Sequence, residues 1–165
     1  MENIFHRVSI RKYEDRPVEK EKILQILRAG MQAPSACNQQ PWKFYVVTNK
    51  DKILELSEAT PYSKCIASAP VVIVPVYIQD DLPAPMFAQI DLSIACENIW
   101  LETDALHLGG VWIGIAPLED RQKIVQDLLA LPENEHVFSL FGLGYPAESK
   151  TQQDRFKEDR IQFVD

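Results

Sequence analysis

The longest predicted helix, residues 86–108, cannot place all its apolar side chains on one narrow face. Apolar residues recur at helical spacing along one stripe, at Phe87, Ile90, Ile94, Leu101, Ala105 and Leu108. A second set, Leu92, Ala95 and Ile99, widens that stripe. Because one sheet face cannot cover a helix that is apolar on more than one side, we expect this helix to lie centrally in the fold or to be shared with a partner subunit.

Shorter helices and strands are predicted on both sides of this helix. The apolar spacing predicts helices over residues 2–7, 18–33, 51–57, with Asn49 as the cap of the third, and 118–131. Strands are predicted over residues 42–47, 70–78, 110–116 and 136–143. Residues 71–74 show no polar alternation, which is typical of a strand buried inside a sheet. The elements mix without a regular β-α-β rhythm, so the pattern favours an α+β fold.

Length and charge narrow the kinds of partner. With 165 residues and ordinary globular composition, residues 1–165 are expected to form a single domain. The formal net charge of −7 disfavours binding to nucleic acid or to an acidic membrane, because such partners require an excess of Lys and Arg. No apolar run reaches the ~18 residues of a membrane span, and no signal peptide opens the sequence. We expect a cytoplasmic protein with a small-molecule ligand.

The cysteines and histidines show no spacing of a disulfide scaffold or a metal centre. Cys37, Cys65 and Cys96 are odd in number and form no CxxC pair, which fits reduced thiols. The histidines are scattered, at positions 6, 107 and 136. None of them has the spacing of a ligand motif such as HExxH, so we expect no bound metal.

Three cations and a hydroxyl lie within residues 7–12 of this acidic protein. Arginine offers a planar fork of donors that matches phosphate oxygens, and a serine hydroxyl adds a neutral donor. If the stretch is extended, Arg7, Ser9 and Arg11 point to the same side. The segment is therefore a candidate phosphate site, although a solvated basic turn has the same composition.

A second candidate cluster covers residues 34–42, where the preceding helix must stop at Pro34. Its short side chains allow a flat heterocycle to approach closely. Its Asn and Gln side chains offer donors and acceptors that suit the edge of a ring bearing carbonyl and N–H groups. An ordinary turn with Trp42 as a core aromatic fits the same residues.

Both clusters belong to a longer series of motifs that runs over almost the whole chain. The motifs are Arg7-x-Ser9-x-Arg11-Lys12-Tyr13, Pro34-Ser35-x-x-Asn38-x-Gln40-Pro41-Trp42, Ala69-Pro70-Val71-Val72-Ile73, Leu108-Gly109-Gly110-Val111-Trp112-Ile113-Gly114, Leu131-Pro132-Glu133-Asn134 and Gly142-Leu143-Gly144-Tyr145-Pro146. In their order and spacing they resemble the nitroreductase family. Each motif is weak alone, and the combination is what carries the resemblance.

The resemblance implies a nitroreductase-like α+β fold with a central, mostly antiparallel sheet flanked by helices. It also implies an interlocked homodimer with FMN at the subunit interface. By that likeness Arg7 and Ser9 would hold the phosphate and ribityl chain of FMN, and Arg11 would lie nearer the pyrimidine edge. The partner subunit would contribute residues of the second cluster, namely Pro34, Ser35, Ala36 and Asn38.

Two further basic positions follow from the same likeness. Lys64 falls where family members often place a lysine near the flavin, and a plain surface lysine is the alternative. Lys64 or Arg11 would stabilise the negative charge of reduced flavin. Arg160 in the polar tail is the candidate second phosphate ligand, with Arg155 and Lys157 as rivals. An apolar patch in the same tail, Ile161, Phe163 and Val164, favours a tail that is tied down rather than frayed.

The implied activity is that of an FMN-dependent oxidoreductase, in which FMN and not a catalytic side chain carries the chemistry. NADH or NADPH would donate a hydride, and nitro compounds, quinones or related electron-poor acceptors would be reduced in a ping-pong cycle. One alternative is an FMN-binding protein without turnover, used for storage or sensing. Another is a flavin-dependent dehalogenase-type relative on the same fold.

The chain departs from the family pattern at two places. Only residues 79–85 separate the predicted strand from the long helix, where larger members insert a helical excursion that helps to cover the active site. We therefore expect an open site. His107 stands where the family commonly has Gly, at a position that asks for a positive φ. Cys37 lies in the loop that would face the partner's flavin, so a redox or steric role for it is left open.

Overall fold

The structure is a computed structural model and describes residues 3–164. Within this range the strands are β1 (Trp42–Val47), β2 (Val71–Ile78), β3 (Gly109–Gly114), β4 (Glu135–Val137) and β5 (Ser139–Gly144). They form one sheet in the order β1-β2-β5-β3, in which β4 also pairs with β2, and every strand pair is antiparallel. The expected α+β class and the mostly antiparallel sheet are confirmed.

β2 lies inside the sheet, between β1 and β5, and both of its faces are buried. Val71 and Ile73 pack on one side with helices α2 (Lys20–Met31) and α4 (Ala88–Ala105). Val72 and Val74 pack on the other side, where α3 (Lys50–Ser57) and α5 (Glu119–Leu129) lie. A strand covered on both faces needs apolar residues at successive positions. The predicted buried strand is therefore confirmed.

The single strand predicted over residues 136–143 is wrong, because the structure divides it into β4 and β5 at Phe138. The amide of Phe138 donates to the carbonyl of Pro75 in β2, over 2.9 Å. Proline has no amide donor to return, so a regular ladder cannot continue across this point. The carbonyl of Phe138 instead accepts from the amides of Ile115 and Ala116.

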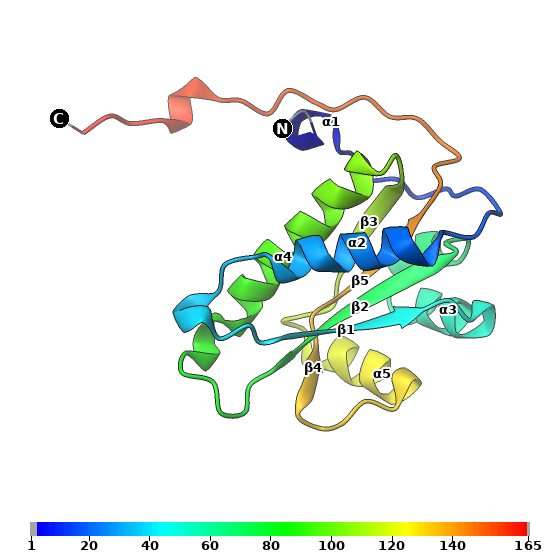
Figure 1. Ribbon diagram of the computed structural model, residues 1–165, viewed down its shortest axis with the longest axis horizontal. Coiled ribbons are helices and arrows are strands. Elements are labelled where there is room, and N and C mark those ends of the chain that lie inside the picture. Colours follow the sequence, from blue (N-terminus) through cyan, green and yellow to red (C-terminus); the bar gives the residue numbers. More distant parts are fainter. Residues whose placement is uncertain (1–2, 165) are drawn as a thin grey trace.

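The helices cover both faces of the sheet, α2 and α4 on one and α3 and α5 on the other (Figure 1). The short helix α1 (Asn3–His6) lies beside the end of α4. The predicted cap of α3 is confirmed, because Asn49 Oδ1 accepts from the amide of Lys52 over 3.0 Å. Among the described residues no helix is long and apolar enough to cross a membrane.

The two apolar sets of α4 point to different surroundings. The set that only widens the predicted stripe, Leu92, Ala95 and Ile99, is fully buried against the sheet and α2. Phe87, Ile90 and Ile94 of the main stripe lie on the outside of the chain, and Ile90 is 55% exposed. One apolar side of α4 therefore packs into the core. The other apolar side is not covered by any of the described residues, 3–164.

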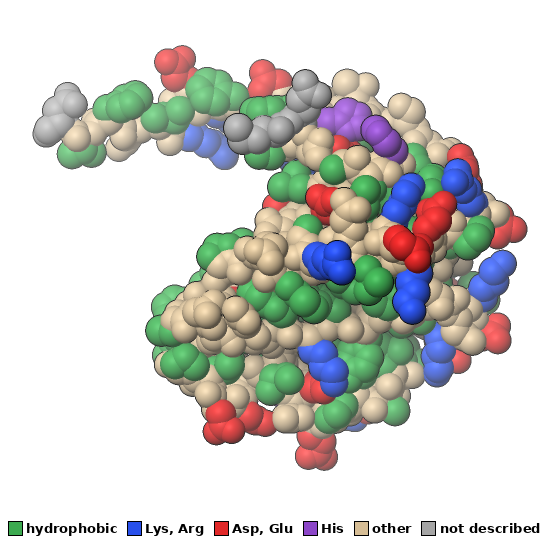
Figure 2. Space-filling model, in the orientation of Figure 1, with side chains coloured by type: hydrophobic (Ala, Val, Ile, Leu, Met, Phe, Trp, Pro, Cys, Tyr) green, Lys and Arg blue, Asp and Glu red, His purple; other side chains and the backbone are tan. Residues whose placement is uncertain are grey.

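The tail after β5 first runs beside residues 7–12, and its last part then leaves the body of the molecule and ends beyond it (Figure 1). Its only regular element is the 3₁₀ turn Glu158–Arg160 within the described residues. Ile161, Phe163 and Val164 are exposed, and Phe163 is 90% exposed. Contacts within one chain thus leave this apolar patch uncovered, and a tail tied down against something else stays a prediction. Figure 2 shows the same segment as an arm that carries apolar atoms.

Candidate functional site

Segment 7–11 is extended and lies beside the edge strand β3. Ser9 forms an isolated parallel bridge with Gly110, and the amide of Ile10 donates to the carbonyl of Gly110 over 3.0 Å. Val8 and Ile10 pack into the core on one side. Because side chains alternate along an extended backbone, the odd-numbered residues Arg7, Ser9 and Arg11 share the opposite side. This supports the orientation predicted from the sequence.

Three side chains that follow β5 hold the other edge of the same segment. Gln152 Nε2 donates to the carbonyl of Arg7 (2.6 Å), Lys150 Nζ donates to the carbonyl of Ser9 (3.1 Å), and Glu148 Oε1 accepts from the amide of Arg11 (2.6 Å). We call Glu148, Lys150 and Gln152 the backbone clamp. Sequence reasoning missed the clamp, whose only signal is three polar residues at every second position.

Two hydrogen bonds favour the charged form of the Glu148 carboxylate. A hydrogen bond from Lys150 Nζ (2.8 Å) and the bond from the Arg11 amide both lower the pKa of Glu148 from its ordinary value. Hydrogen bonds to a charged carboxylate favour that charged form. The candidate phosphate segment is therefore fixed by charge-assisted bonds as well as by β3.

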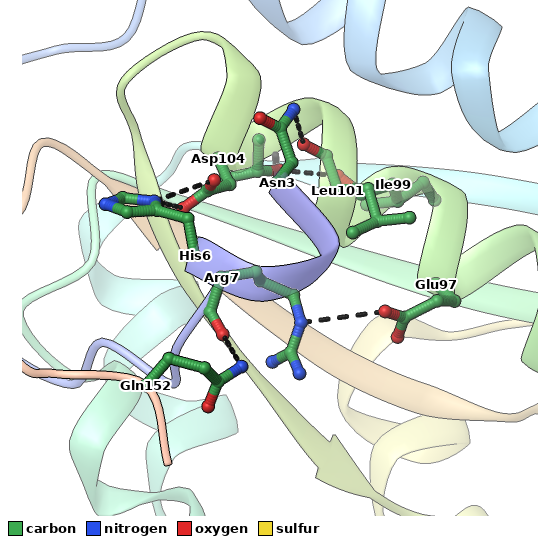
Figure 3. Close-up of polar contacts among 9 residues, drawn as sticks. Asn3, His6, Arg7, Glu97, Ile99, Leu101, Asp104 and Gln152 are labelled. Atoms are coloured by element: carbon green, nitrogen blue, oxygen red, sulfur yellow. Dashed lines mark hydrogen bonds and ion pairs between the residues drawn. The ribbon is translucent and has the colours of Figure 1, made fainter. Parts of the chain in front are cut away.

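Arg7 is the most enclosed cation of the segment, with 13% of its side chain exposed. Its guanidinium carbon lies 4.0 Å from the ring centroid of Trp100. Its Nε lies 3.6 Å from Oε1 of Glu97, and this Nε is buried without a hydrogen-bond partner among the described residues (Figure 3). No hydrogen bond within residues 3–164 engages its two terminal nitrogens. A ligand can therefore use them.

Helix α1 fixes where the Arg7 backbone enters the site (Figure 3). His6 Nδ1 lies 2.9 and 3.0 Å from the two carboxylate oxygens of Asp104 near the end of α4. Asn3 Nδ2 donates to the carbonyl of Leu101 over 3.4 Å. These two contacts place α1 on the last turns of α4. Arg7, which follows α1 directly, is thereby set against the middle of the same helix.

Arg11 borders a cavity of about 380 Å³ at the end of β3. The other lining residues are Tyr62, Trp112, Ile113, Gly114 and Arg121. Gly114 is exposed, and a Cβ atom placed on it would meet nothing within 4 Å, so a flat ring can approach the backbone here. Of these residues only Arg11 was predicted as a site residue. Lys64 is exposed in the nearby 3₁₀ turn Ser63–Ile66 and does not line this cavity.

The second cluster, loop 34–41, is fixed to the first turn of α4 by a buried carboxylate. Asp91 is 3% exposed, and its Oδ1 accepts from the amide of Ala36 over 3.0 Å. Its Oδ2 accepts from Nε2 of Gln39 over 2.6 Å. Ser35 Oγ also accepts from the amide of Gln40. Sequence reasoning missed Asp91, which the chain places far from the loop.

The loop itself has an unusual backbone. Cys37, Asn38 and Gln40 have φ values of 51°, 54° and 46°, in the left-handed region that non-glycine residues rarely adopt. His107 has a φ of 58°, so the positive φ predicted there is confirmed.

The three cysteines are free, and burial raises the pKa of Cys96 to about 12 and raises that of Cys65 as well.

One chain does not bring all predicted site residues together. The cavity beside Arg11 has no lining residue from loop 34–41, so Pro34, Ser35, Ala36 and Asn38 stand apart from it. Arg155 lines a shallow groove with Ile4 and Phe5 of α1. Within the described residues, the side chain of Arg160 on the outgoing tail forms no hydrogen bond or ion pair. Its predicted role is untested by contacts within one chain.

Comparison with known proteins extends the likeness over the whole chain. The model of the nitroreductase family matches residues 4–60 and 56–145. A protein of Methanothermobacter thermautotrophicus, with the provisional name NADH dehydrogenase/NAD(P)H nitroreductase, is 43% identical over 161 residues, covering 98% of this chain and 84% of the relative.

Two solved structures show the same fold. A protein of Clostridium acetobutylicum, provisionally called an NADH oxidase, has a TM-score of 0.96 at 40% identity and covers 99% of both chains. A provisionally named nitroreductase of Desulfovibrio desulfuricans, solved in complex with FMN, has a TM-score of 0.84 at 28% identity, over 99% of this chain and 95% of that one. The family match and the extended sequence identity agree with the motifs on β3, β5 and segment 7–11, and the chain belongs to the nitroreductase family.

Proposed function

We propose that this protein is an FMN-dependent oxidoreductase that takes electrons from NADH or NADPH and passes them to nitro compounds, quinones or related electron-poor acceptors. The observation that carries the proposal is the shared direction of Arg7, Ser9 and Arg11 on a segment held from both edges. The three hydrogen-bond donors lie in a row, with the enclosed guanidinium of Arg7 at one end and the cavity beside Arg11 at the other. The Desulfovibrio relative holds FMN, and the name of the Methanothermobacter relative includes NAD(P)H.

The residues present fit FMN at both of its ends. Among the described residues no hydrogen bond engages the two terminal nitrogens of Arg7, which suits the phosphate. Ser9 lies next on the same side and would contact the ribityl chain. Gly114 leaves open space beside Arg11, where the flat ring system fits.

When bound, FMN would accept a hydride from the nicotinamide and deliver electrons to the acceptor. Arg11 borders the ring cavity, so its positive charge would stabilise the negative charge of reduced flavin at the pyrimidine edge. The positive charge of Lys64 in the neighbouring turn would add to this stabilisation of reduced flavin. Larger family members have a covering segment where this chain has only residues 79–85, so the flavin face would be open. Donor and acceptor would use this face in turn, in a ping-pong cycle.

We further propose that the working unit is a homodimer with one FMN at each of two shared sites. Loop 34–41 stands apart from the cavity beside Arg11 in one chain, which supports the proposal that a second copy supplies Pro34, Ser35, Ala36 and Asn38. The exposed apolar side of α4 gives such a copy a surface to bury. The outgoing tail carries further uncovered apolar residues and Arg160, the candidate second phosphate ligand.

Anaerobic stopped-flow absorbance tests the proposed turnover. The FMN-loaded protein is mixed with NADH or NADPH, and the reduced protein is then mixed with a panel of nitro compounds, quinones and halogenated phenols. We expect bleaching by at least one nicotinamide and recovery of the oxidised spectrum with nitro compounds or quinones. A yellow protein that neither nicotinamide bleaches would contradict turnover and support storage or sensing. Recovery with halogenated phenols alone would support a dehalogenase.

A further inference from the structure

We infer that Trp100 is a positioning residue for Arg7: its indole face fixes the plane of the guanidinium while Glu97 occupies the Nε edge, which leaves the terminal nitrogens for a phosphate group. The inference rests on the proposed function, in which Arg7 binds the phosphate of FMN. It adds two residues of α4 that belong to none of the motifs in segment 7–11 or loop 34–41.

The stacking of Arg7 on Trp100 is close and largely withdrawn from solvent. The guanidinium carbon lies 4.0 Å from the ring centroid, and the Arg7 side chain is 13% exposed. Cation–π contacts are strongest with tryptophan and strengthen when the cation is desolvated. The indole therefore restricts the movement of the guanidinium before any ligand arrives.

Restricting this movement matters because an arginine binds phosphate through two parallel N–H donors on one edge. A freely rotating side chain would lose that freedom on binding, and affinity would fall accordingly. The two terminal nitrogens of Arg7 have no hydrogen-bond partner among residues 3–164. A guanidinium held against the Trp100 ring thus presents its two terminal nitrogens to an anion.

Glu97 decides which edge of the fork stays free. Its Oε1 lies 3.6 Å from Nε of Arg7, so the carboxylate occupies the Nε side (Figure 3). The side chain of Glu97 is partly exposed, and solvent screens its charge from an anion on the far edge. The carboxylate at this position therefore orients the guanidinium through its charge, at little electrostatic cost to phosphate binding.

Trp100 also belongs to the core, since its ring packs edge-on against Phe141 with centroids 5.9 Å apart. A change at Trp100 can therefore disturb the fold without any effect through Arg7. Comparing FMN with riboflavin separates the two roles, because the ligands differ only in the phosphate. A structural defect weakens the binding of both, whereas a misplaced Arg7 weakens only that of FMN.

The test measures the Kd of both ligands by flavin fluorescence with the full chain and its variants. For Trp100→Leu we expect the Kd of FMN to rise about tenfold and that of riboflavin to stay within about twofold. Trp100→Phe keeps a ring face and should raise the Kd of FMN only about threefold. Equal changes for both ligands, or no change for FMN, would overturn the inference.

Glu97 is tested by its charge, because its 3.6 Å contact with Nε of Arg7 is an ion pair and not a hydrogen bond. Glu97→Ala should raise the Kd of FMN about threefold without moving that of riboflavin. Glu97→Gln keeps the shape of the side chain, removes the charge, and should raise the Kd of FMN by a similar factor. A Gln variant that binds FMN as tightly as the wild type would overturn the role assigned to Glu97.

Two further variants keep the outcomes distinct. Phe44→Leu removes an aromatic ring on β1, at the opposite edge of the sheet from β3, and should leave the ratio of the Kd of FMN to that of riboflavin unchanged. A raised ratio in this control would overturn the inference. Arg7→Met should abolish the preference for FMN. If it does not, the phosphate role of Arg7 fails. If it does while Trp100→Leu keeps the preference, only the positioning role fails.

Discussion

Oδ2 of Asp91 accepts a 2.6 Å hydrogen bond from Nε2 of Gln39, and through it the first turn of α4 holds loop 34–41. Oδ1 of the same carboxylate accepts from the amide of Ala36. Gln39 in turn exchanges hydrogen bonds of 3.0 Å with the backbone of Ala84, just before α4. Asp91 and Gln39 together thus connect the loop, the short link over residues 79–85 and the central helix.

Asp91→Ala should destabilise the protein and weaken flavin binding together. The change removes the acceptor of the Ala36 amide and one of the two acceptors of Gln39 Nε2, at a cost of about 1–3 kcal/mol for the two hydrogen bonds together. Because the loop is proposed to contact the ring rather than the phosphate, the affinities for FMN and riboflavin should fall by the same factor. Thermal unfolding and flavin titration measure the two effects. Asp91→Asn keeps one acceptor and should lose less. Unchanged flavin affinity in Asp91→Ala would contradict the loop's role.

Folding stability should fall in acid through Glu148. Its pKa is lowered in the folded protein by the hydrogen bonds from Lys150 and the Arg11 amide, so its contribution to stability is complete above the ordinary value of 4.5. That contribution is lost as the pH falls through the lowered pKa. Glu148→Gln should be less stable at neutral pH and should lose less stability between neutral and acid pH, as measured by denaturant titrations. Glu58→Gln, which changes an exposed carboxylate at the end of α3, is the control. The same loss of stability in acid for all three proteins would count against the clamp.

Tyr13 should contribute to stability through its neutral hydroxyl. This buried group donates to the carbonyl of Ile10 (2.8 Å) and lies 3.0 Å from that of Gly142, and burial raises its pKa above the ordinary 10.0. Tyr13→Phe should cost about 1 kcal/mol at neutral pH. Stability of the wild type should decline as the pH rises above 10.0, where the unfolded phenol ionises, and the variant should decline less. Denaturant titrations measure both, with the exposed Tyr62→Phe as control. Equal decline in the variant would exclude Tyr13 as the cause.

A charge on the outer side of α4 should separate the proposed dimer. Ile90 is 55% exposed in one chain, so Ile90→Asp leaves the fold intact and places a carboxylate in the interface. We expect monomers by analytical ultracentrifugation, together with loss of bound FMN. Ile124→Asp is the matched control, because Ile124 on α5 is 45% exposed and lies on the other face of the sheet. A dimeric Ile90 variant, or a monomeric Ile124 variant, would place the interface elsewhere.

Local patterns in the sequence were enough to predict most elements. β1 begins and ends at the predicted residues 42 and 47, and the cap at Asn49 follows from one side chain and one amide. The common side of Arg7, Ser9 and Arg11 follows from the period of an extended backbone. In each case the deciding interaction lies within a few residues of the element itself.

Other features depend on partners that are distant in the sequence. The break at Phe138 arises because Pro75 on a neighbouring strand lacks an amide, and the role of Asp91 depends on a loop that precedes it by some fifty residues. Apolar spacing shows that α4 has two apolar sides without showing which one meets the sheet. Trp100 and Glu97 likewise gain their position beside Arg7 only through the packing of α1 on α4.

The central claim is that each FMN site is built from two copies of the chain, with Arg7 from one and loop 34–41 from the other. Arg7→Glu and Ala36→Glu should each abolish FMN binding in a homodimer. In a heterodimer of the two variants, isolated through two different tags, one site carries both changes and the other carries none. Flavin absorbance should show a single FMN per heterodimer and none in either homodimer. A heterodimer that binds no FMN, or a homodimer variant that still binds it, would contradict the shared site.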